Sequence, residues 1–158
     1  MNPTTRVLVA GIGNIFLGDD GFGSEVVRRM SASTEPGVRV TDYGIGGMDL
    51  AYDLLDGWDA LVLVDALPDR GAPGQVDIFH AEPGDGAGGL DAHAMHPEAV
   101  FAAVRALGGT IPPTVIVGCQ IASVADGIGL TAPVAAAVGP AVAAVESVVA
   151  ALRHRQEV

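Results

Sequence analysis

Apolar residues in this chain of 158 residues fall into short runs that alternate with stretches of helical periodicity. Short, nearly continuous apolar runs are typical of strands that are buried on both faces of a sheet. One further run alternates apolar and polar residues, which indicates a hairpin-like edge strand. The predicted strands cover residues 7–12, 38–42, 60–65 and 114–119, with the edge strand at 75–80.

Apolar side chains spaced three and four residues apart predict helices between these strands. The first helix begins near residue 20, and the later ones cover about 48–55, 97–107 and 131–153. Thr131 is a candidate N-cap of the last helix. Gly139 and Pro140 are expected to kink or divide that helix, because proline lacks a main-chain donor.

Alternation of strands and helices is the pattern of an α/β fold. We therefore predict a single three-layer α/β/α domain over residues 1–158. Its central twisted, mostly parallel sheet has about five strands and carries helices on both faces. In such sheets ligands bind outside the carboxyl ends of the strands.

Composition and charge exclude several classes of function. The formal net charge is −11 and the chain has no lysine, which argues against nucleic acid and anionic lipid as partners. The only cysteine, Cys119, lies in an apolar run, which favours a buried thiol in a reduced, cytoplasmic protein. No membrane span is expected, because Glu146 and the Gly139–Pro140 pair interrupt the long C-terminal apolar stretch.

The most unusual stretch is RVLVAGIGNIFLGDDGFGSEVVRRM, residues 6–30, in which a strand leads through a glycine turn to an acidic pair. It begins like a dinucleotide-binding fingerprint, but Phe16 stands where the third glycine is required. Asp19 and Asp20 would also place negative charge against a pyrophosphate. A structural alternative is that one of these acids caps the following helix, a task for which one suffices.

A metal site is the third interpretation of this stretch. Asp20 follows the first predicted strand and Asp65 ends the third, while His93 and His96 precede the helix at 97. Two carboxylates and one imidazole can hold a divalent transition metal and leave positions open. The alternatives are that Asp65 binds loop backbone and that both histidines lie in a solvated loop.

Five blocks of the chain resemble a known family in their order and spacing. The most specific block is GIGNIFLGDDGFG at 11–23. The others are DYGIGGMDL at 42–50, LVLVDAL at 61–67, HAMHPEAVFAAVRALGG at 93–109 and VGCQIASVADGIGLTAPV at 117–134. The family that these blocks resemble is that of the [NiFe]-hydrogenase maturation endopeptidases.

The resemblance implies an endopeptidase that removes the C-terminal extension of a [NiFe]-hydrogenase large-subunit precursor after nickel insertion. It implies that Asp20, Asp65 and His93 recognise nickel that the precursor brings, with His96 as the alternative third ligand. On this interpretation the substrate supplies the nickel, so the isolated protein can be free of metal.

Contact with the substrate tail is expected at Asp42 and at the glycines Gly46 and Gly47, which permit close approach of another chain. For cleavage, one hypothesis is that nickel polarises the scissile carbonyl or activates water. The other makes Asp19 or Asp20 a general base. The alternatives from other classes are a non-catalytic nickel-binding chaperone of the same assembly and a nucleotide-binding domain.

Overall fold

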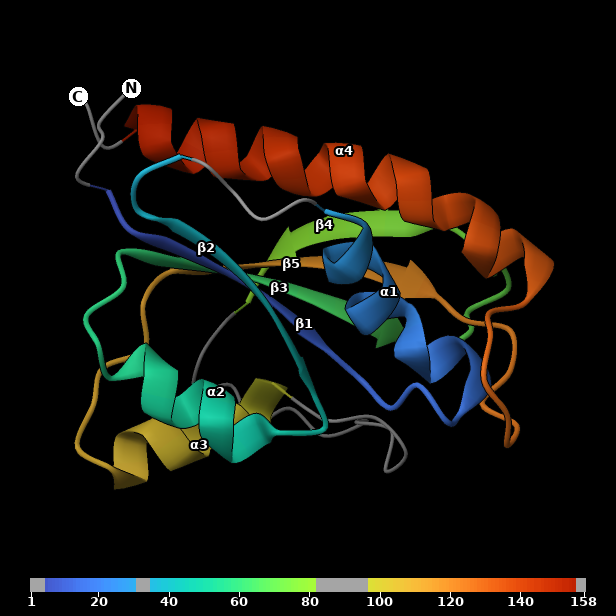
Figure 1. The fold of residues 1–158 in the computed structure, drawn as a ribbon, viewed down its shortest axis with the longest axis horizontal. Helices are drawn as coiled ribbons and strands as arrows, with labels where there is room; N and C mark the ends of the chain where they lie inside the picture. Colours follow the sequence, from blue (N-terminus) through green and yellow to red (C-terminus); the bar gives the residue numbers. More distant parts are fainter. Residues whose placement is uncertain (1–4, 31–34, 82–96, 156–158) are drawn as a thin grey trace.

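A computed structural model of the protein describes residues 5–30, 35–81 and 97–155, and Figure 1 shows its five-stranded sheet between helices. The strands are β1 (Val7–Ile12), β2 (Val38–Gly44), β3 (Ala60–Leu67), β4 (Val76–His80) and β5 (Thr114–Gln120). The helices are the 3₁₀ turn η1 (Gly18–Gly21), then α1 (Phe22–Arg29), α2 (Gly47–Leu54), α3 (Pro97–Ala106) and α4 (Ala132–Arg155).

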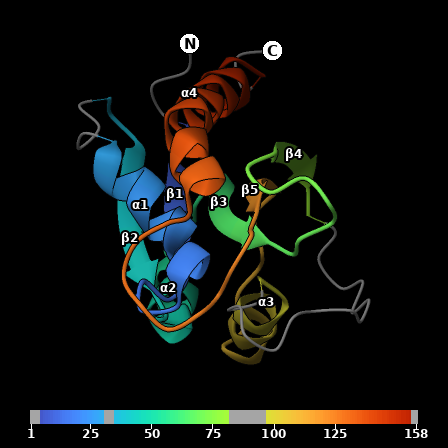
Figure 2. The ribbon, with the colours of Figure 1, turned by 90° about the vertical axis from the view of Figure 1, so that its right-hand side faces the viewer.

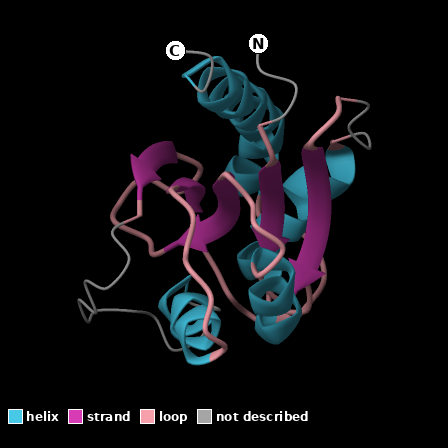
Figure 3. Ribbon diagram, turned by 90° about the vertical axis from the view of Figure 1, so that its left-hand side faces the viewer, coloured by secondary structure: helices cyan, strands magenta, loops and turns pink. Residues whose placement is uncertain are grey.

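The strands lie in the order β2-β1-β3-β5-β4, and all neighbouring pairs are parallel except β4 with β5. Side chains of alternate strand residues form two apolar clusters. One cluster packs against α1 and α4, and the other packs against α2 and α3. The two helical layers are visible on either side of the sheet in Figures 2 and 3. The predicted three-layer α/β architecture is confirmed.

Two elements differ from the sequence prediction. β4 is an edge strand, as expected, but its antiparallel partner is β5, which follows it by more than thirty residues, so it forms no hairpin with β3. α4 is one continuous helix through Pro140 and is not divided there. Gly139 and Pro140 lie on its exposed side, while Val138 and Ala141 are buried beside them and hold the helix on the sheet.

α4 is also, among the described residues, the one helix long and apolar enough to cross a membrane. Its buried residues recur every three or four positions and belong to the core cluster that covers the sheet. These residues are Val134, Ala137, Val138, Ala141, Val145 and Val149. A single apolar stripe of this kind is the pattern of a core helix.

Close packing of α1 on the sheet brings the turn η1 to the carboxyl ends of β1 and β3. Gly23, near the start of α1, permits this contact. A Cβ atom at Gly23 would lie 2.3 Å from the Val64 carbonyl oxygen and 2.4 Å from that of Ile12. Only a residue without a side chain allows this approach. The acidic pair in η1 therefore sits beside the end of β3.

Candidate active site

Asp65 is a buried carboxylate near the carboxyl end of β3, with 5% of its surface exposed. It alternates with Val64 and Ala66, which face α1 and α4, so it shares the other face with Leu63. Its Oδ1 accepts the main-chain N–H of Ala66 at 2.8 Å. Loop backbone was the partner expected for this carboxylate, but the bond is to β3 itself, and it fixes one oxygen.

Asp20 lies in η1 and is 1% exposed. Its Oδ2 accepts the main-chain N–H of Asn14 at 2.8 Å, so the glycine turn after β1 wraps around this carboxylate. Gly13, with φ +138°, packs against Asp20: a Cβ there would lie 2.0 Å from the Asp20 carbonyl oxygen. The turn thus needs glycine at position 13 in order to hold Asp20 in place.

Asp20 and Asp65 are close enough to repel each other. The pKa of Asp65 is raised well above its ordinary value, chiefly by burial and further by the negative charge of Asp20, against the opposing Ala66 hydrogen bond. Two buried carboxylates in this relation favour a shared proton or a bound cation. The two acids therefore lie near enough for the charge of Asp20 to act on Asp65, while their joint binding of a metal stays a prediction.

The third expected ligand is not placed. His93 and His96 lie outside the described residues, so the choice between them stays a prediction. Within the described ranges, no group of three Asp, Glu, His or Cys side chains is arranged to hold a metal.

Asp19 has a different role from its neighbour. It is fully buried, and its carboxylate accepts four hydrogen bonds from the segment that joins β5 to α4. The donors are the N–H groups of Ala122 (2.9 Å), Ser123 (3.1 Å) and Thr131 (2.7 Å) and the Thr131 hydroxyl (2.8 Å). Burial raises the pKa of Asp19, but these bonds outweigh it and leave the pKa lowered. An enclosed carboxylate of low pKa is a poor general base.

Neither acid caps α1, so the capping interpretation was wrong. The N-cap is Gly21, with no side-chain hydrogen bond, because η1 intervenes between the acidic pair and the helix. Asp19 instead fixes η1 to a distant segment. Main-chain bonds reinforce this link, from the Asp19 N–H to the Ser123 carbonyl and from the Gly18 N–H to the Gly127 carbonyl, both 2.9 Å.

The expected substrate contacts lie near the carboxyl end of β2, which contains Asp42, and at the start of α2. Asp42 Oδ1 accepts the Ser24 hydroxyl at 2.7 Å, and Oδ2 lies 3.1 Å from Arg28 Nε. A basic group of a substrate would compete with Arg28 for this carboxylate. Gly46 is the N-cap of α2 and Gly47 begins that helix, so both belong to its first turn. Their contact with a substrate stays a prediction.

Cys119 is fully buried in β5, and its Sγ–H donates to the Gln120 carbonyl at 3.4 Å. Burial raises its pKa to about 11, with smaller increases from Asp19 and Asp77 against an opposing hydrogen bond from Gly74. The expectation of a buried thiol is confirmed, and a thiol of this pKa is a poor nucleophile near neutral pH.

Comparison with known proteins gives one consistent result. A sequence model described as "Hydrogenase maturation protease" matches residues 24–148. The chain is 33% identical over 154 residues to the hydrogenase 2 maturation protease of Escherichia coli (strain K12), covering 94% of this chain and 92% of that one. It is 31% identical to the hydrogenase expression/formation protein HupD of Rhizobium leguminosarum bv. viciae, covering 96% of this chain and 76% of the relative.

Solved structures agree with these sequence relatives. The hydrogenase maturating endopeptidase HybD from E. coli superimposes with a TM-score of 0.76 at 32% identity, covering 96% of this chain and 94% of that chain. A [NiFe] hydrogenase maturation protease HycI from Thermococcus kodakarensis KOD1 gives a TM-score of 0.68 at 25% identity, covering 94% and 93%.

Proposed function

The chain belongs to the hydrogenase maturation protease family, and we propose that it removes the C-terminal extension from the large-subunit precursor of a [NiFe]-hydrogenase after nickel insertion. The names of its relatives support a hydrolase of peptide bonds that acts in hydrogenase maturation. The unpaired, buried thiol of Cys119 accords with the cytoplasm as the proposed location.

In this proposal, nickel is cargo carried by the precursor and is recognised by Asp20, Asp65 and a histidine, His93 or its alternative His96. The observation that carries this step is the burial of both carboxylates, with the charge of Asp20 raising the pKa of Asp65. A divalent cation would relieve that repulsion, and carboxylate and imidazole ligands suit nickel. The precursor would then bind with high affinity only when its metal is present.

Each carboxylate is held before substrate arrives. The Asn14 N–H fixes Asp20 and the Ala66 N–H fixes Asp65, so recognition requires little rearrangement of either side chain. Peptide hydrolysis then follows either of two routes. Nickel polarises the scissile carbonyl or activates a water molecule, or Asp20 accepts a proton from water.

The test is incubation of the purified protein with nickel-loaded and nickel-free precursor, followed by intact-mass measurement. We expect the wild-type protein to remove a C-terminal peptide from the nickel-loaded precursor and not from the nickel-free one. The Asp20→Asn and Asp65→Asn proteins should leave the nickel-loaded precursor uncut. Cleavage by both variants at the wild-type rate would overturn the assigned site. An uncut precursor that stays bound to the wild-type protein would favour a non-catalytic nickel-binding chaperone.

A further inference from the structure

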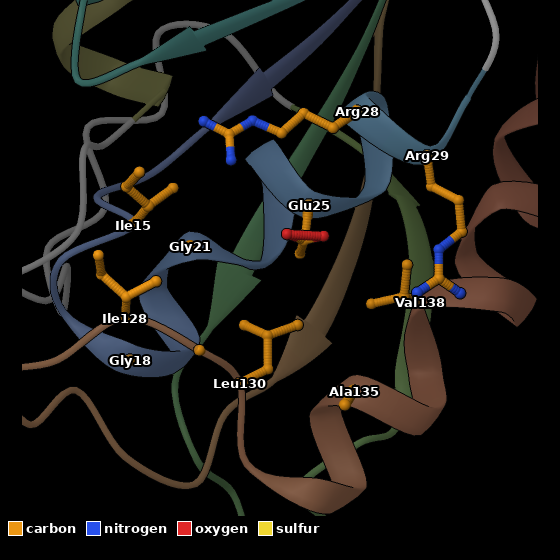
Figure 4. Close-up of a pocket in the computed structure, with 11 residues that line it drawn as sticks. Ile15, Gly18, Gly21, Glu25, Arg28, Arg29, Ile128, Leu130, Ala135 and Val138 are labelled. Atoms are coloured by element: carbon orange, nitrogen blue, oxygen red, sulfur yellow. The ribbon is translucent and has the colours of Figure 1, made fainter.

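A small pocket lies behind the turn that carries Asp20, between α1, the connection from β5 to α4, and α4 itself (Figure 4). Its volume is about 230 Å³. Small-molecule sites usually span about 300–1,000 Å³, so this pocket suits one large side chain better than a cofactor. Asp65 faces the opposite side of the sheet, which makes this pocket distinct from the carboxylate pair.

The walls of the pocket are mostly apolar. They are formed by Ile15, Ile128, Leu130, Ala135 and Val138, with Gly18 and Gly21 of η1 behind them. Two exposed apolar side chains stand nearby, Ile128 in the wall at 76% and Phe16 at 61%. The two loops that carry these side chains are hydrogen-bonded to each other, since the N–H of Gly127, the residue before Ile128, donates to the Phe16 carbonyl at 2.9 Å. Exposed apolar groups beside a pocket are typical of a protein contact.

Charge at the pocket has a definite arrangement. Figure 4 shows Arg29 extending from α1 toward Val138 of α4, whereas Arg28, which also lines the pocket, extends in the other direction, with Glu25 between them. Arg28 is paired with Asp42. Among the described residues Arg29 makes no ion pair or hydrogen bond, although the chain carries a net charge of −11. An unpaired guanidinium at the pocket edge would attract a carboxylate of a partner.

We propose that this pocket is a second docking site for the large-subunit precursor, which inserts one apolar side chain between α1 and α4 and places a neighbouring carboxylate on Arg29. The proposal rests on the proposed function for the identity of the partner. Glu25 disfavours a carboxylate deeper in the pocket and so sets the orientation of the segment. The pocket wall is the back of the turn that bears Asp20, so a precursor docked here lies next to the cleavage site.

The experiment compares Arg29→Glu and Ala135→Trp with the wild-type protein. The first reverses the charge and the second fills the pocket without changing the charge. We expect each to raise the KM for nickel-loaded precursor about tenfold and to leave kcat unchanged. The matched control is Arg105→Glu, an exposed change in the last turn of α3 on the other face of the sheet, which should leave KM unchanged.

Precursor binding by biolayer interferometry gives a readout that does not depend on cleavage. Arg29→Glu should weaken binding by the same factor. Because Arg29 is exposed, the variant should fold normally, and its thermal unfolding curve, compared with that of wild type, checks this. If the Arg29→Glu protein bound the precursor as tightly as wild type and had the same KM, the docking site would be overturned while the protease function would stand. A wild-type protein that binds the precursor but never shortens it would overturn the protease function and leave this binding test intact.

A second copy of the chain is the competing occupant. Sedimentation of the wild-type and Arg29→Glu proteins decides between the two. A dimer that Arg29→Glu dissociates, with an unchanged KM, would assign the pocket to self-association and overturn the proposal.

Discussion

The carboxylate of Asp19 accepts two hydrogen bonds from Thr131, a residue 112 positions later in the chain. The donors are the main-chain N–H at 2.7 Å and the side-chain hydroxyl at 2.8 Å. Thr131 directly precedes α4, so this contact joins the start of the last helix to the turn after the first strand. The neighbouring Asp20 belongs to the same turn. Asp19 therefore anchors the turn that carries Asp20.

Asp19→Asn should lower the free energy of unfolding by about 2–3 kcal/mol, because the amide group cannot accept the hydrogen bonds that the second carboxylate oxygen accepts. Donors of Ala122, Ser123 or Thr131 that face the buried Asp19 side chain would then lack their partner. Urea denaturation measures the change. Asp126→Asn, an exposed change in the same connection, is the control and should stay within about 0.5 kcal/mol of wild type.

The free energy of unfolding of the wild-type protein should also depend on pH because of Asp19. Its pKa is lowered on folding, so the ionised form stabilises the folded state. That contribution is complete above the ordinary carboxyl value of 3.8 and is lost as pH falls through the lower value of the folded protein. The gap in stability between wild type and Asp19→Asn should therefore narrow below about pH 4. A gap that stays constant down to pH 2 would contradict this assignment.

Asp65→Asn should raise the melting temperature at pH 7 while reducing cleavage at least about a hundredfold. The pKa of Asp65 is raised by burial and by Asp20, so folding stability falls as pH rises from the ordinary carboxyl value of 3.8 toward the raised value. Replacement by a neutral group of the same size removes this cost. Calorimetry and the precursor assay measure the two effects, and Asp56→Asn, at an exposed position, should change neither.

Two glycine substitutions should have opposite effects on stability. Gly23→Ala should cost at least about 3 kcal/mol, because its Cβ would meet carbonyl oxygens of Val64 and Ile12 at 2.3 and 2.4 Å. Gly139→Ala should gain about 0.5–1 kcal/mol, because it lies in α4 with open space around the new Cβ. Urea denaturation compares both with wild type. A stable Gly23→Ala protein would show that α1 can move away from the sheet.

Cys119 should resist iodoacetamide in the native protein at pH 8. Its pKa of about 11 leaves little thiolate, and the side chain is fully buried. In urea the thiol should react at the rate of an ordinary cysteine. Mass spectrometry measures the extent of labelling. Rapid labelling of the folded protein would indicate that β5 opens locally.

Local patterns in the sequence were sufficient for the strands and helices. The bounds predicted for the first strand are those of β1, because every residue from Val7 to Ile12 is buried. β3 runs two residues past its predicted end at Asp65, since Ala66 and Leu67 pair with Cys119 and Gln120 of β5. The carboxylate of Asp65 suggested the end of the strand, but pairing with β5 extends β3 beyond it.

The candidate site was predictable only in part. The rule that parallel strands end at one edge of a sheet predicted that Asp20 and Asp65 approach each other, and the charge of Asp20 does raise the pKa of Asp65. The separate task of Asp19 was not predictable, because its four donors lie more than a hundred residues away and form no local pattern. Capping was the nearest local explanation for an acid before a helix, and η1 made it incorrect.

The link between Asp19 and the segment before α4 also bears on how the protein is made. A ribosome adds about 5–20 residues per second, so β1, β2 and β3 emerge well before the donors at 122–131. During that interval the nascent chain has both acids of the candidate site but lacks the partners that hold their turn. The turn can be completed only once Thr131 is available. A chain whose synthesis stops earlier would therefore have no ordered site with which to cleave a hydrogenase precursor.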